Sequence, residues 1–248
     1  QKALDKGAAD TVTTSMEEAV KDADIVVSAV PVEAMESVFT EMAPFLKSDA
    51  VVTDVGSTRQ TVIAAARKGL GDKFHQYAPA HPIAGGEMPG VDYASADLFD
   101  EKVVISTPDE GMDPKVVTFI EEAWRKAGAR VQAMSPLQHD LTFASVSHLP
   151  HVLAYALVDM IAREENAQEK LKMAGAGFRD FTRIASSSPV MWRDICLSNR
   201  EALSHELKRY RASLDTLQKY IDESDGKALE SVFENAVRNR RGLVFPGK

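Results

Sequence analysis

Cysteine is nearly absent from the sequence, since Cys196 is the only one among 248 residues. An intrachain disulfide is therefore excluded, and a reducing, cytoplasmic setting is expected. Positive charge is also scarce, because 29 Lys and Arg residues stand against 37 Asp and Glu residues and the net charge is −8. No long block of Lys or Arg occurs, so neither nucleic acid nor an anionic membrane surface is expected as a partner.

Long uninterrupted apolar runs are lacking as well. Those that occur, such as residues 25–32, are far too short to span a bilayer. No membrane segment is therefore expected. A chain of this length buries roughly 70–75% of the surface that its unfolded form exposes, and we expect one or two domains with a substantial core.

Strand and helix patterns alternate through residues 1–134. Residues 25–30 are almost continuously apolar, which predicts a parallel strand covered on both faces. Pro31 ends this strand and begins a helix that is predicted to reach Leu46. Further strands are predicted at residues 50–54, 75–79, 102–106 and 129–132, and a further helix at residues 114–127. Such alternation predicts a doubly wound parallel sheet.

The strand patterns stop after residue 134, and the rest of the sequence is helical in pattern. Helices are predicted at residues 135–162, with an interruption at Pro150, and at residues 189–224 and 227–239. We therefore divide the chain into a nucleotide-binding part, 1–134, and a helical part, 135–248. An elongated helical half commonly buries its apolar stripes against a second copy, which predicts a homodimer.

The glycine motif that normally opens a dinucleotide-binding sheet is missing. Such a sheet begins with a strand, the motif G-x-G-x-x-G and a helix, and the glycines let the backbone approach the pyrophosphate. The G-x-G at residues 175–177 follows no strand, and we interpret it as a turn between helices. We expect the sequence to begin after the first strand, with roughly 35–40 residues of a standard first βαβ unit preceding Gln1.

Two polar clusters follow predicted strands, where ligands bind in open α/β sheets. The first cluster, residues 53–57, ends in Ser57, which is also a candidate N-cap for a helix that follows. The second, residues 80–87, contains His81. A histidine in such a place can act as a general base near neutral pH. The alternative for His81 is a hydrogen bond within a loop.

A third cluster comprises His139, Asp140 and residues 147–151. His148 and His151 are three positions apart and would share a helical face. No cysteine is near and no third ligand has the expected spacing, so a metal site is not expected. Structural roles and substrate contact both stay open for these histidines.

The fourth cluster surrounds Arg183, which lies between apolar residues in the segment 177–185. A half-buried guanidinium group needs an anionic partner. That partner is either internal, namely Asp140 or Glu87, or it is a carboxylate of the substrate.

Together these motifs resemble those of prephenate/arogenate dehydrogenases, the oxidative enzymes of tyrosine biosynthesis. They occur in the family's order and cover nearly the whole chain. The motifs are DVGS (54–57), HPIAG (81–85), SHLPH (147–151), FRDFTRIA (178–185) and MWRD (191–194). The resemblance implies a Rossmann-like parallel-sheet domain with an incomplete first βαβ unit, then an all-helical dimerisation domain. It also implies NAD or NADP as the hydride acceptor.

The resemblance further implies roles for individual residues. His81 corresponds to the catalytic histidine, which hydrogen-bonds the ring hydroxyl of the substrate, and Ser57 to the serine that assists it. Arg183 corresponds to the arginine that binds the substrate carboxylate. The other implied substrate-binding residues are His151, His148, Gly85, Glu87 and Asp140, the last two as an ionic network with the arginine. The residues implied to bind the cofactor are Ala29, Val30, Pro31, Asp54 and Gly56.

The implied reaction is the oxidative decarboxylation of prephenate to 4-hydroxyphenylpyruvate, with hydride transfer to NAD(P)+. Arogenate, which would give tyrosine, is the alternative substrate. An acidic residue after the HPIAG motif favours arogenate in the family, and Gly86 stands there in this sequence. Two rival functions stay open: a β-hydroxyacid dehydrogenase, which would need a lysine motif that we do not find, and an inactive dimerising fragment that binds no cofactor.

Overall fold

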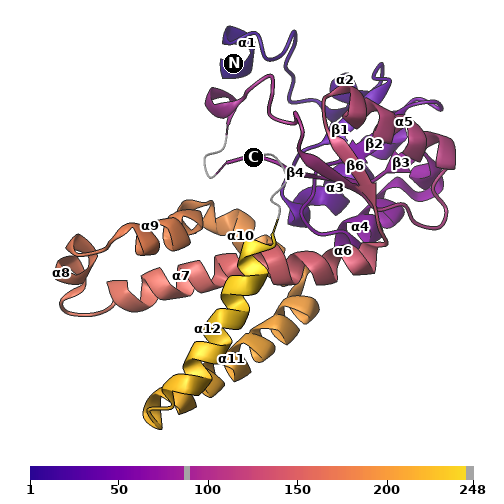
Figure 1. Ribbon diagram of the computed structural model, residues 1–248. Helices are drawn as coiled ribbons and strands as arrows, with labels where there is room; N and C mark the ends of the chain where they lie inside the picture. Colours follow the sequence, from indigo (N-terminus) through magenta and orange to yellow (C-terminus); the bar gives the residue numbers. More distant parts are fainter. Residues whose placement is uncertain (87–89, 244–248) are drawn as a thin grey trace.

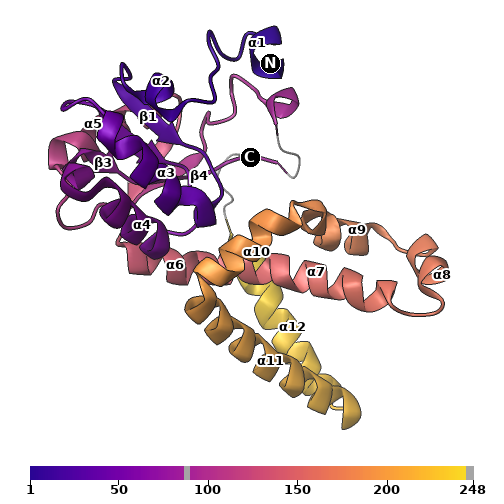
Figure 2. The same ribbon diagram turned by 180° about the vertical axis from the view of Figure 1, so that it is seen from behind.

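The computed structural model describes residues 1–86 and 90–243. Figure 1 shows a sheet-containing part, built from the first half of the chain, and a set of long helices that extends away from it. The strands lie between helices, with α3 (Met35–Met42) and α4 (Gln60–Leu70) on one side. Figure 2 views the molecule from behind and shows this side.

The described strands form two three-stranded sheets, β1-β2-β3 and β4-β5-β6. The strands are β1 (Ile25–Ser28), β2 (Val51–Asp54), β3 (Tyr77–Ala78), β4 (Ala80–Ile83), β5 (Val103–Ser106) and β6 (Arg130–Ala133). Parallel pairing is confirmed for β1 with β2, for β2 with β3 and for β5 with β6. The carboxyl ends of β1 and β2 therefore meet at one edge.

Strand β4 departs from the expected parallel pattern, because it pairs antiparallel with β5 and sets His81 opposite Ile105. A parallel pair needs a crossover connection that carries the chain back to the same end of the sheet, usually a helix. Among the described residues between β4 and β5, the only helical element is the short 3₁₀ turn Val91–Tyr93. The interpretation of His81 as a loop residue is therefore wrong, since it lies within a strand.

Four helices of the sheet-containing part pack around the strands and form the main core, and these are α2 (Met16–Val20), α3 (Met35–Met42), α4 (Gln60–Leu70) and α5 (Pro114–Lys126). Helix α1 (Lys2–Asp5) has no buried residue and lies apart from the strands in Figure 1. Helices α3 and α4 pack closely because Gly69 lacks a side chain: a Cβ there would lie 2.6 Å from the Cβ of Phe39. Phe39, Met35 and Val52 are completely buried in this core.

Strand β1 is less covered than its apolar sequence predicts. Ile25 is 41% exposed and Val27 is 52% exposed. Within the described residues β1 pairs with β2 alone, so its other edge has no neighbouring strand. The prediction of a strand covered on both faces is wrong for this structure.

The helical part begins with a long rod, which consists of α6 (Pro136–Phe143), the π turn Ala144–His148 and α7 (Leu149–Ala162). The helices that follow the rod are α8 (Ala167–Lys172), α9 (Ala176–Thr182), α10 (Pro189–Ser198), α11 (Arg200–Asp222) and α12 (Gly226–Arg241). The expected interruption takes the form of the π turn, which ends directly before α7, and Pro150 lies in the first turn of α7, where its missing N–H costs little. The π turn before it keeps the rod continuous.

The rod Pro136–Ala162 is long and apolar enough to cross a membrane, judged by length and composition alone. Inspection of uninterrupted apolar runs missed this segment because polar residues are spaced along it. One such helix is weak evidence for a membrane protein, since a helix that packs in a soluble assembly has the same composition. Among the residues of α7, only Leu149 and Ala154 are buried within this single chain.

The remaining helices differ from the sequence prediction, which gave no bounds for α8 and α9 and joined α10 to α11. The predicted run 189–224 is two helices, because Asn199 between α10 and α11 leaves the helical conformation. Gly175 lies between α8 and α9 as the N-cap of α9, as predicted, whereas Gly177 lies inside α9 and not in the predicted turn. Figures 1 and 2 both show α11 and α12 side by side, projecting away from the strands.

Candidate functional site

A buried ion pair lies at the carboxyl end of β2. The two oxygens of Asp54 accept hydrogen bonds of 2.8 Å each from Nη1 and Nη2 of Arg59, and both side chains are completely buried. The hydroxyl of Tyr77 also donates to Asp54. Burial is the largest single effect and alone would lower the pKa of Arg59, but Asp54, Tyr77 and Asp140 together outweigh it and raise the pKa. The guanidinium group is therefore charged.

The same guanidinium group joins two segments that carry candidate catalytic residues. Nη1 of Arg59 donates to the carbonyl oxygen of Gly56 at 2.7 Å and to that of Ala80 at 3.1 Å. These carbonyls immediately precede Ser57 and His81 in the chain. Arg59 thus ties the loop after β2 to the start of β4.

Gly56 is required by a close approach inside this loop. Its N–H donates to Oδ1 of Asp54 at 2.7 Å, and a Cβ on Gly56 would lie 2.9 Å from the same oxygen. Both Asp54 and Gly56 face this internal network, and their predicted contact with the cofactor stays a prediction.

Helix α4 is capped by a residue from the helical part of the chain. The backbone N–H groups of Arg59 and Gln60 donate to the carboxylate of Asp140 at 2.8 and 3.0 Å. Ser57 lies before the helix, whose N-cap position is Arg59. The prediction of Ser57 as N-cap is therefore wrong: the cap comes from a residue 81 positions along the chain, which local sequence does not reveal.

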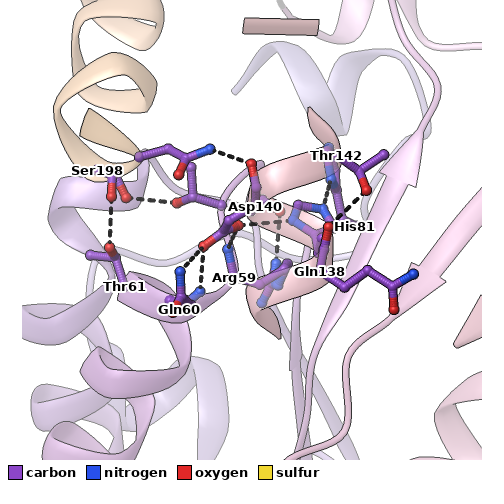
Figure 3. A network of polar contacts seen from close by, with 12 residues as sticks. Arg59, Gln60, Thr61, His81, Gln138, Asp140, Thr142 and Ser198 are labelled. Atoms are coloured by element: carbon purple, nitrogen blue, oxygen red, sulfur yellow. Dashed lines mark hydrogen bonds and ion pairs between the residues drawn. The ribbon is translucent and has the colours of Figure 1, made fainter. Parts of the chain in front are cut away.

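His81 and His139 lie in direct contact. Nδ1 of His81 is 2.7 Å from Nε2 of His139, and Nδ1 of His139 is 2.9 Å from Oδ1 of Asp140. Figure 3 shows Asp140 between the start of α4, with Arg59 and Gln60, and the strand that carries His81. The row of contacts therefore links the start of α4 to the candidate base.

Burial keeps His81 uncharged. The side chain is 9% exposed, and its ring packs 5.0 Å from that of Phe143. Burial lowers the pKa of His81 well below the ordinary value of 6.5, and the nearby His139 and Arg59 lower it further. At neutral pH the ring is neutral and has one basic nitrogen, as a general base requires.

His148 and His151 differ in their surroundings although both come from one motif. His148 is 1% exposed, and its Nδ1 lies 3.1 Å from the side-chain nitrogen of Asn199. Burial lowers the pKa of His148 to about 4. His151 is half-buried and stacks on Trp192 with a centroid distance of 3.5 Å, and its Nδ1 donates to the carbonyl of Ser147.

These contacts give His148 a structural setting and leave Nε2 of His151 as an acceptor. Substrate contact stays a prediction for both histidines.

The remaining predicted substrate residues lie on loops and turns. Arg183 is exposed and begins a 3₁₀ turn after α9. Gly85 follows β4 with a φ of 120°, a conformation that favours glycine. Glu87 lies outside the described residues. Both oxygens of Asp140 are engaged by α4 and His139, so its contacts serve the site from within the protein.

The predicted cofactor residues Ala29, Val30 and Pro31 lie just beyond the carboxyl end of β1, with Ala29 and Pro31 exposed. This position is the one at which nicotinamide cofactors meet an open parallel sheet. The residues therefore fit the nicotinamide end of such a cofactor. Within residues 1–86 and 90–243 there is no strand followed by a glycine-rich phosphate loop.

The sequence did not predict a role for Arg59 or Asn199. His139 was a candidate for a structural role or substrate contact, but its contact with His81 was not predicted. Asp54 ends a strand, and Arg59 stands five positions later, just before a helix. This spacing of an acidic and a basic residue could have pointed to Arg59. Over the part of the chain that the structure describes, no group of three or more His, Cys, Asp or Glu residues is arranged to hold a metal ion.

Comparison with known families identifies both halves of the chain. The nucleotide-binding domain of prephenate dehydrogenases matches residues 1–133, and the dimerization domain of the same enzymes matches residues 135–235. The chain belongs to the prephenate dehydrogenase family. The predicted family, fold class and enzyme class are thereby confirmed, whereas the boundary near residue 134 and the roles of single site residues stay predictions.

Individual members of the prephenate dehydrogenase family are similar over most of their length. A cyclohexadienyl dehydrogenase from Zymomonas mobilis is 38% identical over 94% of this chain and 80% of its own. A prephenate dehydrogenase from Bacillus subtilis is 35% identical over 99% of this chain and 67% of its own. A prephenate dehydrogenase from A. aeolicus, crystallised with hydroxyphenyl propionate and NAD+, has a TM-score of 0.88 and 36% identity, covering 97% of this chain and 84% of that one.

Proposed function

We propose that this chain catalyses the oxidative decarboxylation of prephenate to 4-hydroxyphenylpyruvate with NAD(P)+ as the hydride acceptor. The observation that carries the proposal is the neutral, buried imidazole of His81, whose Nδ1 is taken by His139 and whose Nε2 is left to act as a base. Arogenate is the second candidate substrate, since the similar Zymomonas mobilis protein is named for cyclohexadienyl substrates in general.

The chain's own residues supply proton transfer and positioning. When bound, the nicotinamide accepts the hydride that leaves the hydroxyl-bearing ring carbon. His81 accepts the hydroxyl proton as positive charge develops on that carbon. The ring carboxylate leaves as CO₂, and the electrons of the broken bond complete the aromatic ring. The proton then returns from His81 to the phenolate oxygen.

Arg183 is proposed to position the substrate through a carboxylate. Paired charge-assisted bonds from a guanidinium group are both directional and strong. Losing them costs roughly 1.5–3 kcal/mol, which corresponds to about 10–150-fold in binding. Arg183→Ala is therefore expected to raise KM for the substrate by about that factor and to change kcat less.

The test assays the full-length protein and Arg183→Ala with prephenate and arogenate, each with NAD+ and NADP+, by following nicotinamide reduction. Prephenate is expected to be the better substrate. The exposed Arg179→Ala, four positions away on α9, is the matched control and should leave KM unchanged. Absence of reduction with every pair would refute the proposed function, and a normal KM in Arg183→Ala would refute the role of that arginine.

The protein is further proposed to be a cytoplasmic homodimer. No residue of α12 is buried within one chain, and Phe233 is 54% exposed on it. The dimerization-domain match includes this residue. A second copy would cover such apolar faces and those of the rod Pro136–Ala162.

Sedimentation equilibrium is expected to give the mass of two chains. Phe233→Glu should shift the protein toward one chain, whereas Arg130→Ala on β6 should not. A wild-type protein that sediments as a single chain at micromolar concentration contradicts the dimer.

A further inference from the structure

We propose that His139 and Asp140 set the tautomer of His81, so that Nδ1 of His81 carries the hydrogen and Nε2 is the basic nitrogen. The catalytic consequence rests on the proposed function, but the tautomer itself does not. The ionisation state of Asp140 determines which nitrogen of His139 carries the hydrogen, and His139 in turn determines it for His81.

Asp140 can act only as an acceptor. Its side chain is 2% exposed and accepts hydrogen bonds from the backbone N–H groups of Arg59 and Gln60, at 2.8 and 3.0 Å. Burial by itself raises the pKa of Asp140, but the hydrogen bonds from His139 and from these two amides outweigh it and hold the pKa below its ordinary value. The group is therefore a carboxylate, which has no hydrogen to donate.

The carboxylate dictates the hydrogen positions on His139. Nδ1 of His139 lies 2.9 Å from Oδ1 of Asp140, so this nitrogen must be the donor. Burial lowers the pKa of His139 although Asp140 opposes the shift, and the ring is therefore neutral at neutral pH. A neutral imidazole with its hydrogen on Nδ1 presents a lone pair at Nε2.

That lone pair in turn dictates the tautomer of His81. Nδ1 of His81 lies 2.7 Å from Nε2 of His139, and only one of two nitrogens in contact can donate. Since His139 accepts, Nδ1 of His81 donates and its Nε2 has no hydrogen. A cationic His139 would reverse this order, so the tautomer of His81 depends on the burial that keeps His139 neutral.

Arg59 holds both ends of this row of groups. Its backbone N–H binds Asp140, and its guanidinium group binds the carbonyl of Ala80, the residue before His81. Figure 3 shows Arg59 and Asp140 side by side, with His81 beyond. Arg59 therefore holds both the carboxylate of Asp140 and the strand segment that carries His81. This fixes the position of the carboxylate relative to the base.

The consequence for catalysis is a base whose Nε2 carries no hydrogen and can accept the proton of the substrate hydroxyl. The other tautomer would present an N–H to the substrate hydroxyl and accept no proton. In the serine protease triad, the wrong histidine tautomer costs about 10⁴-fold in kcat. Here His139→Leu removes an acceptor without imposing the wrong tautomer, so we expect a smaller loss of about 10–100-fold in kcat with KM nearly unchanged.

The experiment reads the tautomer directly, by ¹⁵N–¹H correlation spectra of the histidine rings in the full-length protein. The His81 signals are assigned by their loss in His81→Asn. We expect Nδ1 of His81 to be protonated and Nε2 to be unprotonated in the wild type. In His139→Leu both tautomers should appear. His139→Gln keeps an acceptor oxygen near the position of Nε2 and should restore the single tautomer and most of kcat.

Each outcome decides a different point. A hydrogen on Nε2 of His81 in the wild type overturns the proposal whatever the activity is. A single unchanged tautomer in His139→Leu also overturns it. The expected spectra in a full-length protein that reduces neither NAD+ nor NADP+ with either substrate leave the tautomer inference standing and remove the proposed function instead. His139 is varied rather than Asp140, because loss of Asp140 would also uncap α4.

Discussion

His81→Asn is expected to lower kcat by about 10²–10⁴-fold while KM changes little, the usual contribution of one positioned proton transfer. Asparagine can place an amide donor near Nε2 of His139, so the local hydrogen bond survives. It has no nitrogen that can take a proton from the substrate hydroxyl. The variant therefore separates proton transfer from folding and binding, and steady-state kinetics with prephenate measures it.

The dependence of kcat/KM on pH gives a second test of His81 as the base. A histidine base works only while it is neutral. Burial lowers the pKa of His81 well below 6.5, with His139 and Arg59 acting in the same direction. The neutral form therefore persists as the pH falls, and the acid limb of kcat/KM that belongs to His81 is expected below pH 6.5.

His205→Asn on α11 is the matched control, because His205 is exposed, and it should leave kcat and the profile unchanged. A His81→Asn enzyme with normal kcat contradicts the assignment of His81 as the base.

Arg59→Met is expected to cost about 3–5 kcal/mol in the free energy of unfolding, because it leaves the Asp54 carboxylate buried and without its cation. The pair is completely buried and bidentate, unlike the exposed ion pairs elsewhere on the molecule. Methionine is similar in length to the arginine stem and fills part of the same space. Urea unfolding of wild type and variant measures the difference.

Two further variants test the physical reason for this loss. Arg125→Met breaks a partly exposed pair with Glu121 on α5 and should cost about 1 kcal/mol or less. The double variant Asp54→Leu with Arg59→Met removes both charges and should recover part of the loss, because no unpaired charge is left buried. If Arg59→Met costs no more than the Arg125 control, the pair contributes little and Arg59 does not tie the two segments together.

Local patterns in the sequence predicted much of the architecture. The apolar run at β1 and the alternation after it predicted parallel strands, and the loss of strand patterns after residue 134 predicted the helical part. These predictions succeed because a strand or helix depends on residues two to four positions apart. The antiparallel β4 was missed, because strand direction depends on the connection between β4 and β5 and not on the residues inside β4.

The sequence by itself determined the family and the candidate base, because the motif around His81 and those that follow it occur in a specific order. Only the tertiary structure decided what holds that base. His139 reaches His81 across 58 positions, and Asp140 reaches Arg59 across 81. Contacts over such separations depend on how the rod α6–α7 packs against α4 and β4. No local spacing in the sequence encodes that packing. The packing gives Asp140 and Arg59 the internal contacts that surround His81.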